Sequence, residues 1–214
     1  MPVDKAGTRV ADDAVLRIKG AIKRFVSRGG EKLAGALVDL DVDPAGLSCL
    51  DVGASTGGFT DCLLQSGARC VVAVDVGHGQ LAEKLRQDSR VTVLEKTNAR
   101  ELDKSEWSAA IDLVVADVSF ISLRLLLPAI CQAAPGAVWL LMVKPQFELG
   151  RGKVGKGGVV RDPLLRSEAV DGVAAAAAEC GYVEQARADS RLAGPKGNLE
   201  IFLHLTCLRP GASR

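Results

Sequence analysis

The feature that most constrains this chain is a series of apolar runs, each the length of one strand. They cover residues 48–53, 70–76, 91–94, 111–117 and 137–143. Their apolar residues are continuous rather than alternating, which is typical of strands buried on both faces of a parallel sheet. Helix-like segments lie between them, at residues 58–66, 79–87, 122–134 and 163–180. With two more strands expected at residues 182–188 and 199–208, the pattern predicts an α/β protein with an open, doubly wound, mostly parallel seven-stranded sheet.

The last of these helices has clear end signals. Asp162 is a candidate N-cap, Pro163 suits the first helical position, and Gly181 suits the C-terminal stop. A Gly/Lys-rich segment, residues 145–161, directly precedes it. A loop of this length inside a compact domain is usually functional or mobile.

The charges nearly cancel over the chain but not along it. The 214 residues carry 27 Lys and Arg against 26 Asp and Glu, which excludes a uniformly basic nucleic-acid binder. Residues 1–32 nevertheless hold eight basic and four acidic residues, and residues 144–161 hold five and one. Two local basic patches on a slightly acidic body favour an anionic partner held at one place.

Cysteine usage and apolar stretches bear on the compartment. The six cysteines form no C-x-x-C pair and have no neighbouring His, so no metal site is expected. We expect them to be free thiols in a reducing cytoplasm. The N-terminus has no signal-peptide pattern. Residues 125–143 contain no charge, but Pro128 and the Pro135-Gly136 pair interrupt them, which favours a helix, a turn and a strand over a membrane span.

A glycine-rich turn follows the first strand. Residues 51–59 read DVGASTGGF, and Gly53, Gly57 and Gly58 would allow close backbone approach to a ligand. The spacing fits neither G-x-G-x-x-G nor a P-loop. Asp75, at the end of the second strand, suits a ribose diol. Together they indicate a nucleoside ligand without pyrophosphate, such as S-adenosylmethionine; the alternative is an ordinary turn with a solvated acid.

Other polar residues follow the remaining strands. Asn98 could read an adenine edge or simply form a turn. Asp117 and Lys144 each come one residue after a buried strand, Glu200 begins the last strand, and Lys32 lies in the early SRGGEKL segment. Acids and lysines gathered at one edge of a sheet are typical of an active site.

Seven motifs together resemble one family. They are GASTGGFTDCLL, VDVGHGQL, KTNAREL, DLVVADVSFISL, VKPQFELG, GGVVRDP and GNLEIF. In this order they are similar to the TlyA-type branch of the FtsJ-like ribose 2′-O-methyltransferases, a branch often labelled haemolysin A. The resemblance runs from about Phe25 to about Leu208 and implies a Rossmann-like class I methyltransferase fold.

The resemblance also implies residue roles. The Lys-Asp-Lys-Glu tetrad of the family falls on Lys32, Asp117, Lys144 and Glu200. Its contacts to S-adenosylmethionine fall on Gly53, Ser55, Thr56, Gly57, Gly58, Phe59, Asp75, Asn98 and Asp117. The substrate class of the family implies ribosomal RNA or ribosomal subunits as partners. It implies no membrane partner. No oligomeric state is predicted.

Our mechanistic hypothesis assigns Lys144 as the base that takes the proton of a ribose 2′-hydroxyl. A lysine acts as a base when burial or a neighbouring cation disfavours its charged form, and Lys32 is the proposed cation. Asp117 would position Lys144, and Glu200 would pair with Lys32. Basic residues flanking these positions are expected to contact RNA phosphates: Lys23, Arg24, Arg28, Arg151, Lys153, Lys156 and Arg161. The glycines between Arg151 and Arg161 suggest a lid that becomes ordered when RNA binds.

The sequence departs from the family in two ways. Thr56 stands where FtsJ itself has Pro, as in TlyA-type proteins generally. Those proteins also begin with an S4-type RNA-binding domain, of which only VLRIKG (residues 15–20) resembles a part. We therefore expect residues 1–24 to be an N-terminal extension, a candidate remnant of that domain, and residues 25–210 to be the methyltransferase domain.

Three other functions remain open at this stage. A membrane-acting haemolysin would need an amphipathic or inserting element, which the sequence does not offer. A non-catalytic RNA-binding module could share the fold. A small-molecule methyltransferase would have no use for basic flanks.

Overall fold

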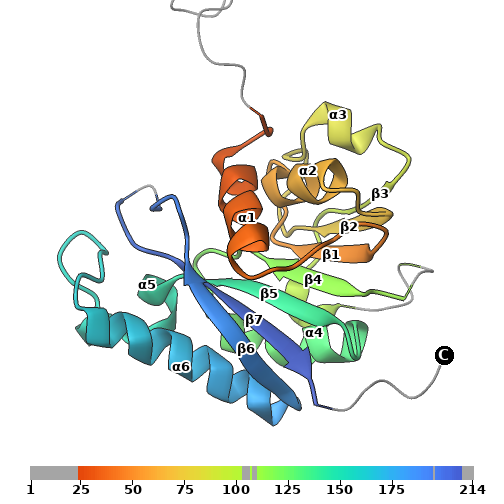
Figure 1. The fold of residues 1–214 in the computed structure, drawn as a ribbon. Coiled ribbons are helices and arrows are strands. Elements are labelled where there is room, and N and C mark those ends of the chain that lie inside the picture. Colours follow the sequence, from red (N-terminus) through yellow and green to blue (C-terminus); the bar gives the residue numbers. More distant parts are fainter. Residues whose placement is uncertain (1–23, 103–106, 108–109, 195, 209–214) are drawn as a thin grey trace, which may run out of the picture.

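A computed structural model describes residues 24–102, 107, 110–194 and 196–208 of the chain (Figure 1). The calls for Lys23 and for nearly all of the N-terminal extension therefore lie outside the described residues. No helix among the residues described is long and apolar enough to cross a membrane. Residues 125–143 instead contribute to a short helix, a turn and a strand, as the interrupting prolines predict.

One seven-stranded sheet, ordered β3-β2-β1-β4-β5-β7-β6, organises the molecule (Figure 1). Its parallel strands are β1 (Ser48–Val52), β2 (Cys70–Val74), β3 (Val91–Leu94), β4 (Leu113–Ala116) and β5 (Val138–Val143). β7 (Ile201–Cys207) runs antiparallel to β5 and to the edge strand β6 (Tyr182–Asp189). The predicted mostly parallel sheet is confirmed, with strand ends within about two residues of those expected.

Each face of the sheet has its own core. Helices α1 (Arg28–Asp39) and α2 (Gly58–Gln65) cover one face, where Leu33 and Leu63 pack against strand residues such as Val115. Helices α4 (Leu127–Ala133) and α6 (Pro163–Glu179) cover the other, where their apolar side chains pack against Val114 and Trp139. Neighbouring residues Val114 and Val115 thus enter opposite cores, which is why the strands read as continuous apolar runs.

The predicted helix ends vary in accuracy. α6 begins as predicted, because the Asp162 side chain accepts a hydrogen bond from Leu164 N at 2.8 Å and Pro163 occupies the first turn. The expected helix over residues 79–87 is only the short α3 (Glu83–Arg86). The one over residues 122–134 is divided into η3 (Leu123–Leu125) and α4, because Pro128 lacks the N–H of a helix interior and lies in the first turn of α4.

Four further helical elements were not expected. α1 was missed although Leu33, Ala36, Leu37 and Leu40 form a buried stripe at helical spacing. The segment of residues 145–161 contains α5 (Pro145–Glu148) and η4 (Arg151–Lys153). A single turn, η1 (Ala99–Glu101), follows β3.

Candidate active site

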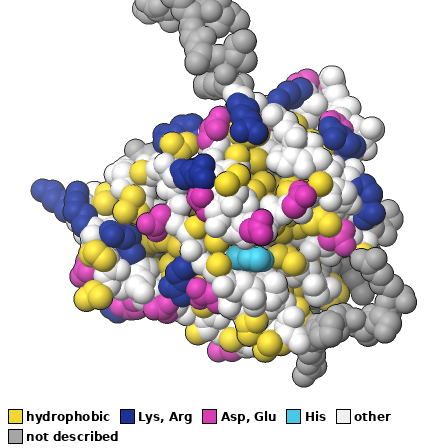
Figure 2. Space-filling view, in the orientation of Figure 1, with side chains coloured by type: hydrophobic (Ala, Val, Ile, Leu, Met, Phe, Trp, Pro, Cys, Tyr) yellow, Lys and Arg dark blue, Asp and Glu magenta, His cyan; other side chains and the backbone are white. Residues whose placement is uncertain are grey.

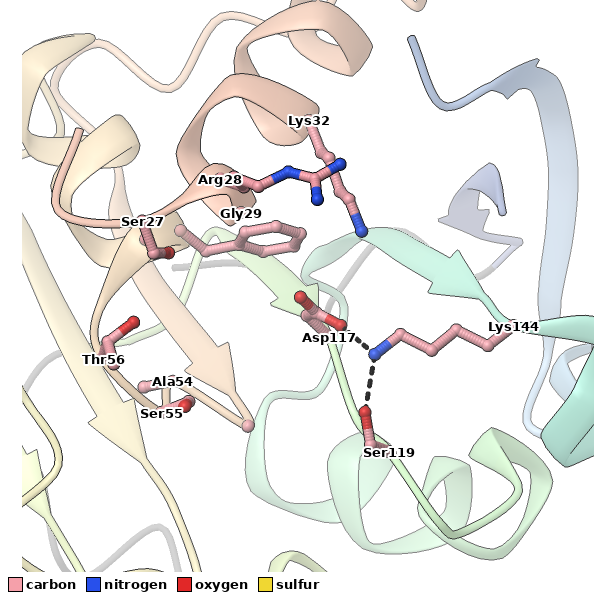
Figure 3. Close-up of a pocket in the computed structure, with 13 residues that line it drawn as sticks. Ser27, Arg28, Gly29, Lys32, Ala54, Ser55, Thr56, Asp117, Ser119 and Lys144 are labelled. Carbon is pink, nitrogen blue, oxygen red and sulfur yellow. Dashed lines mark hydrogen bonds and ion pairs between the residues drawn. The ribbon is translucent and has the colours of Figure 1, made fainter. Parts of the chain in front are cut away.

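A cavity with a volume of about 220 Å³ lies at the carboxyl ends of the parallel strands, where the chain's winding reverses between β1 and β4 (Figure 3). Ligands of open α/β sheets bind at such a switch point. Three segments and one strand end line it: the start of α1, the turn after β1, the segment after β4, and Lys144 after β5. The lining residues are Ser27, Arg28, Gly29, Lys32, Gly53, Ala54, Ser55, Thr56, Gly58, Phe59, Asp117, Ser119 and Lys144.

Glycines in the turn after β1 allow neighbouring backbones to approach closely. A Cβ on Gly53, whose φ is +85°, would lie 2.7 Å from the carbonyl oxygen of Asp117. A Cβ on Gly58 would lie 2.1 Å from Ser27 Oγ and 2.9 Å from Gly30 N. The amino ends of α1 and α2 therefore pack together at the cavity wall, an arrangement that suits an anionic group.

The structure separates the predicted cofactor residues into two groups. Gly53, Ser55, Thr56, Gly58, Phe59 and Asp117 line the cavity, and Gly57, Asp75 and Asn98 do not. Asp75 is half-buried next to this turn, where its carboxylate accepts hydrogen bonds from Ser55 N at 2.8 Å and Gly77 N at 2.6 Å. Each oxygen keeps a lone pair for another donor.

Asn98 interacts with its own turn. Its Oδ1 accepts a hydrogen bond from Arg100 N at 3.1 Å, and its Nδ2 donates to Glu101 Oε1 at 3.1 Å. This is the turn-forming alternative that the sequence left open. An adenine contact by Asn98 stays a prediction.

Lys144 enters the cavity from the end of β5, across from the turn after β1 (Figure 3). Its Nζ lies 2.5 Å from Asp117 Oδ1 and donates a hydrogen bond to Ser119 Oγ at 2.8 Å. The Lys144 side chain is only 11% exposed, so few waters compete for these contacts. Ser119 was not predicted, although it lies in the quoted DLVVADVSFISL motif.

A second ion pair lies beside the first. Lys32, on the buried face of α1, pairs with Glu200, which lies one residue before β7. Both side chains are buried. A Cβ on Gly194 would lie 2.7 Å from Glu200 Oε1, so glycine leaves room for the carboxylate. Arg28 Nη2 also donates to Ala193 O at 3.0 Å, which ties α1 to the same segment.

A second cavity, of about 380 Å³, adjoins the first, and Ser119 and Lys144 line both. Phe120 and Phe147 form an aromatic pair in its wall, with ring centroids 5.3 Å apart. Phe120 is 91% exposed and has φ +66°, a backbone conformation that non-glycine residues rarely adopt. An exposed aromatic held in strained backbone is typical of a functional position.

Asp51, within β1, is an acid that the sequence analysis left without a role. It is fully buried, and Thr60 Oγ1 donates a hydrogen bond to its Oδ2 at 2.6 Å. Burial raises the pKa of Asp51 to about 7, although the Thr60 hydrogen bond acts in the opposite direction. The sequence signal that could have identified Asp51 is an acidic residue inside an apolar strand.

Five of the predicted RNA-contacting residues are exposed, and one of them, Arg28, lines the first cavity. Arg24, Arg28, Lys153, Lys156 and Arg161 are exposed. Lys153 pairs with Glu168 of α6, and the Arg24 guanidinium lies 4.7 Å from the centre of the Phe25 ring. For Arg151 the structure describes only the backbone, in η4. Figure 2 shows Lys and Arg side chains projecting at the left of the view, where Figure 1 places the loop before α6.

The sheet order and the structural neighbours define a class I methyltransferase fold. The pattern of the FtsJ-like methyltransferases matches residues 25–207. The chain belongs to this family, in its TlyA and haemolysin A branch.

Two curated relatives illustrate the branch. The 16S/23S rRNA (cytidine-2′-O)-methyltransferase TlyA of Mycobacterium tuberculosis is 51% identical over 207 residues, which cover 96% of this chain and 77% of the relative. Hemolysin A of Brachyspira hyodysenteriae is 44% identical over 183 residues, covering 85% and 76%.

Solved structures agree with this fold. A candidate hemolysin from Streptococcus thermophilus superposes with a TM-score of 0.85 at 41% identity, covering 90% of this chain and 70% of that one. Magnesium protoporphyrin IX methyltransferase from Synechocystis, solved with bound S-adenosylmethionine, has a TM-score of 0.56 at 14% identity and covers 84% and 78%. The second likeness concerns the fold alone.

Proposed function

We propose that this protein transfers a methyl group from S-adenosylmethionine to the ribose 2′-hydroxyl of a cytidine in ribosomal RNA. The observation that carries the proposal is the position of Lys144, whose amine lines both the glycine-walled cavity and the aromatic cavity beside it. The names of the relatives supply the cytidine and the ribosomal RNA. A ribosomal substrate would place the activity in the cytoplasm.

The first cavity fits the cofactor. At Gly53 and Gly58 the wall of the cavity is bare backbone. A Cβ atom at either position would collide with neighbouring atoms. Arg28 and the amino end of α1 would hold the carboxylate of the methionine part, and Asp75 would accept hydrogen bonds from the ribose diol. When bound, S-adenosylmethionine supplies a methyl group already activated by its sulfonium.

In this proposal the Nζ of Lys144 would take the proton of the 2′-hydroxyl. Asp117 and Ser119 hold the Nζ of Lys144 between the two cavities. Lys32 lines the same cavity as a second cation, and Glu200 holds Lys32 in place. Alignment of the hydroxyl supplies a further part of the rate enhancement.

RNA would be held by the exposed cations around the cavities. Arg28 lines the first cavity, and Lys156 and Arg161 belong to the loop after Lys144. Phosphate contacts of this kind position the RNA without reading its sequence. They also distinguish the proposal from a small-molecule methyltransferase.

The test is transfer of a labelled methyl group to ribosomal subunits that lack native methylation at the target. The label should enter RNA and survive in an alkali-resistant dinucleotide, because a 2′-O-methyl group blocks cleavage at that ribose. Label on protein or on a base would contradict ribose methylation. Cofactor binding without transfer to either subunit would support the non-catalytic alternative. Leakage of dye from lipid vesicles by the pure protein would support the haemolysin.

A further inference from the structure

We propose that Gln146 recognises the target base, by pairing its side-chain amide with the hydrogen-bonding edge of cytosine in the second cavity. This inference rests on the proposed function and deepens it. It concerns a residue for which neither the family resemblance nor the sequence analysis gave a role.

The other polar side chains of that cavity are already engaged. Asn198 is buried, with Oδ1 accepting from Val160 N at 2.9 Å and Nδ2 donating to Gly158 O at 2.8 Å. Glu200 pairs with Lys32, and Ser119 accepts from Lys144. Lys196 also lines the cavity, but it is exposed to solvent. A positive charge in such a position suits a phosphate better than a base. Among the amide and hydroxyl side chains of this lining, only Gln146 makes no hydrogen bond within the described part of the chain.

The side-chain oxygen of Gln146 lacks a partner within the described part of the chain. This oxygen, Oε1, is buried. An unpaired buried acceptor destabilises a protein, so a residue of this kind needs a reason to be there. A ligand in the cavity that donates to Oε1 would remove the penalty.

The position of Gln146 in the chain fits this role. It lies between Lys144 and Phe147, separated from Lys144 by Pro145 in the first turn of α5. The proton-accepting lysine, the amide and an aromatic ring thus follow each other on one short backbone segment. A nucleoside whose ring stacks in the cavity would present its base edge near Gln146 while its ribose lies near Lys144.

Cytosine complements an amide chemically. Its exocyclic amino group donates and its neighbouring ring nitrogen accepts, and a side-chain amide offers one acceptor and two donors. Both hydrogen bonds can form at once, away from competing water. Sites built around buried hydrogen-bonding groups discriminate strongly against groups that leave them unpaired.

The experiment compares Gln146→Leu with the wild type in methyl transfer to subunits lacking the native modification. We expect kcat/KM for the subunit to fall at least tenfold, while the Kd for S-adenosylmethionine stays unchanged and the Tm does not fall. Gln132→Leu is the matched control, because Gln132 is exposed on α4, away from both cavities. Gln146→Glu keeps an acceptor for the cytosine amino group and should fall between the wild type and Gln146→Leu.

A second substrate separates base recognition from a structural role. In an RNA fragment whose target ribose carries no base, Gln146→Leu should have no further effect, because the amide has lost its partner. A tenfold loss that persists on the abasic target would overturn the inference. If Gln146→Leu melts early, Gln146→Met, equally long and without an amide, takes its place in the same comparison.

The outcomes also separate this inference from the proposed function. Wild-type protein that transfers no label to RNA contradicts the proposed function. Wild-type protein that transfers label while Gln146→Leu stays within twofold of it contradicts the role of Gln146 alone.

Discussion

The ionisable side chains of this site differ in whether each has an oppositely charged partner. Lys144 and Lys32 each have a carboxylate partner, in Asp117 and Glu200. Removing one partner of a buried pair leaves the other charge without compensation. Asp51 differs because its Oδ1 has no hydrogen-bond partner among the described residues and its pKa is raised to about 7 by burial. Near pH 7 such a carboxyl is divided about equally between its neutral and charged forms.

The raised pKa of Asp51 predicts a pH dependence of stability. An aspartate in an unfolded chain titrates near about 3.9. Below that pH both states are protonated and this contribution to stability is fully present; as the pH rises toward about 7, only the unfolded state releases its proton. The free energy of unfolding should therefore fall across this window, by at most about 4 kcal/mol.

Asp51→Asn has no such proton and keeps an oxygen that can accept from Thr60. Urea denaturation of both proteins at several pH values between about 4 and about 8 gives the comparison. The difference in stability should shift in favour of the variant as the pH rises. Parallel curves would contradict a raised pKa at Asp51.

At the scale of elements, the segments after β4 and β5 are joined by one buried acid. Glu148, at the end of α5, accepts hydrogen bonds from Ser122 Oγ at 2.5 Å and from Leu123 N at 2.8 Å. Arg124 Nε lies 3.4 Å from the same carboxylate. The joined segments carry Ser119 and Phe120 on one side and Lys144 and Phe147 on the other, so Glu148 maintains the geometry of both cavities.

Replacement of Glu148 by Ala should cost about 1–3 kcal/mol of stability, because Leu123 N would remain buried without an acceptor. Ser122→Ala removes one hydrogen bond from the same cluster and should cost only about 0.5–1.5 kcal/mol. Urea denaturation with a constant m-value would measure both. Equal stability of Glu148→Ala and the wild type would show that the two segments do not depend on this contact.

Sequence patterns predicted the elements better than their tertiary relations. Asp117 and Lys144 could be found because each directly follows a strand buried on both faces. Lys32 and Glu200 are 168 residues apart, and α1 was not predicted, so only the family resemblance suggested their pairing. The second cavity escaped prediction because its wall combines side chains from several loops, and loop conformation depends on contacts such as those of Asn198.

At the scale of the whole molecule, exposed cations lie around two cavities at one edge of the sheet. Lys156 and Arg161 are exposed and belong to the loop before α6. The net charge of the chain is only +1, so any attraction to RNA must come from this local arrangement.

The double variant Lys156→Ala/Arg161→Ala should bind ribosomal subunits more weakly and with less dependence on salt. Each lost phosphate contact lowers the slope of log K against log salt by about 0.7–0.9, so the pair should lower it by about 1.5. Binding measured from about 50 to about 200 mM KCl gives the slope. Arg90→Ala is the control, since Arg90 pairs with Asp88 and lines neither cavity. An unchanged slope in the double variant would exclude these two residues from the RNA contact.

The central claim is that Lys144 is the base in transfer of a methyl group to a ribose hydroxyl. The most direct measurement follows Lys144→Ala in two assays, equilibrium binding of S-adenosylmethionine and label transfer to hypomethylated subunits. We predict that the variant binds the cofactor with a Kd close to that of the wild type and transfers label at least a hundredfold more slowly, the usual contribution of a general base. Transfer by Lys144→Ala at a rate near that of the wild type would contradict the account.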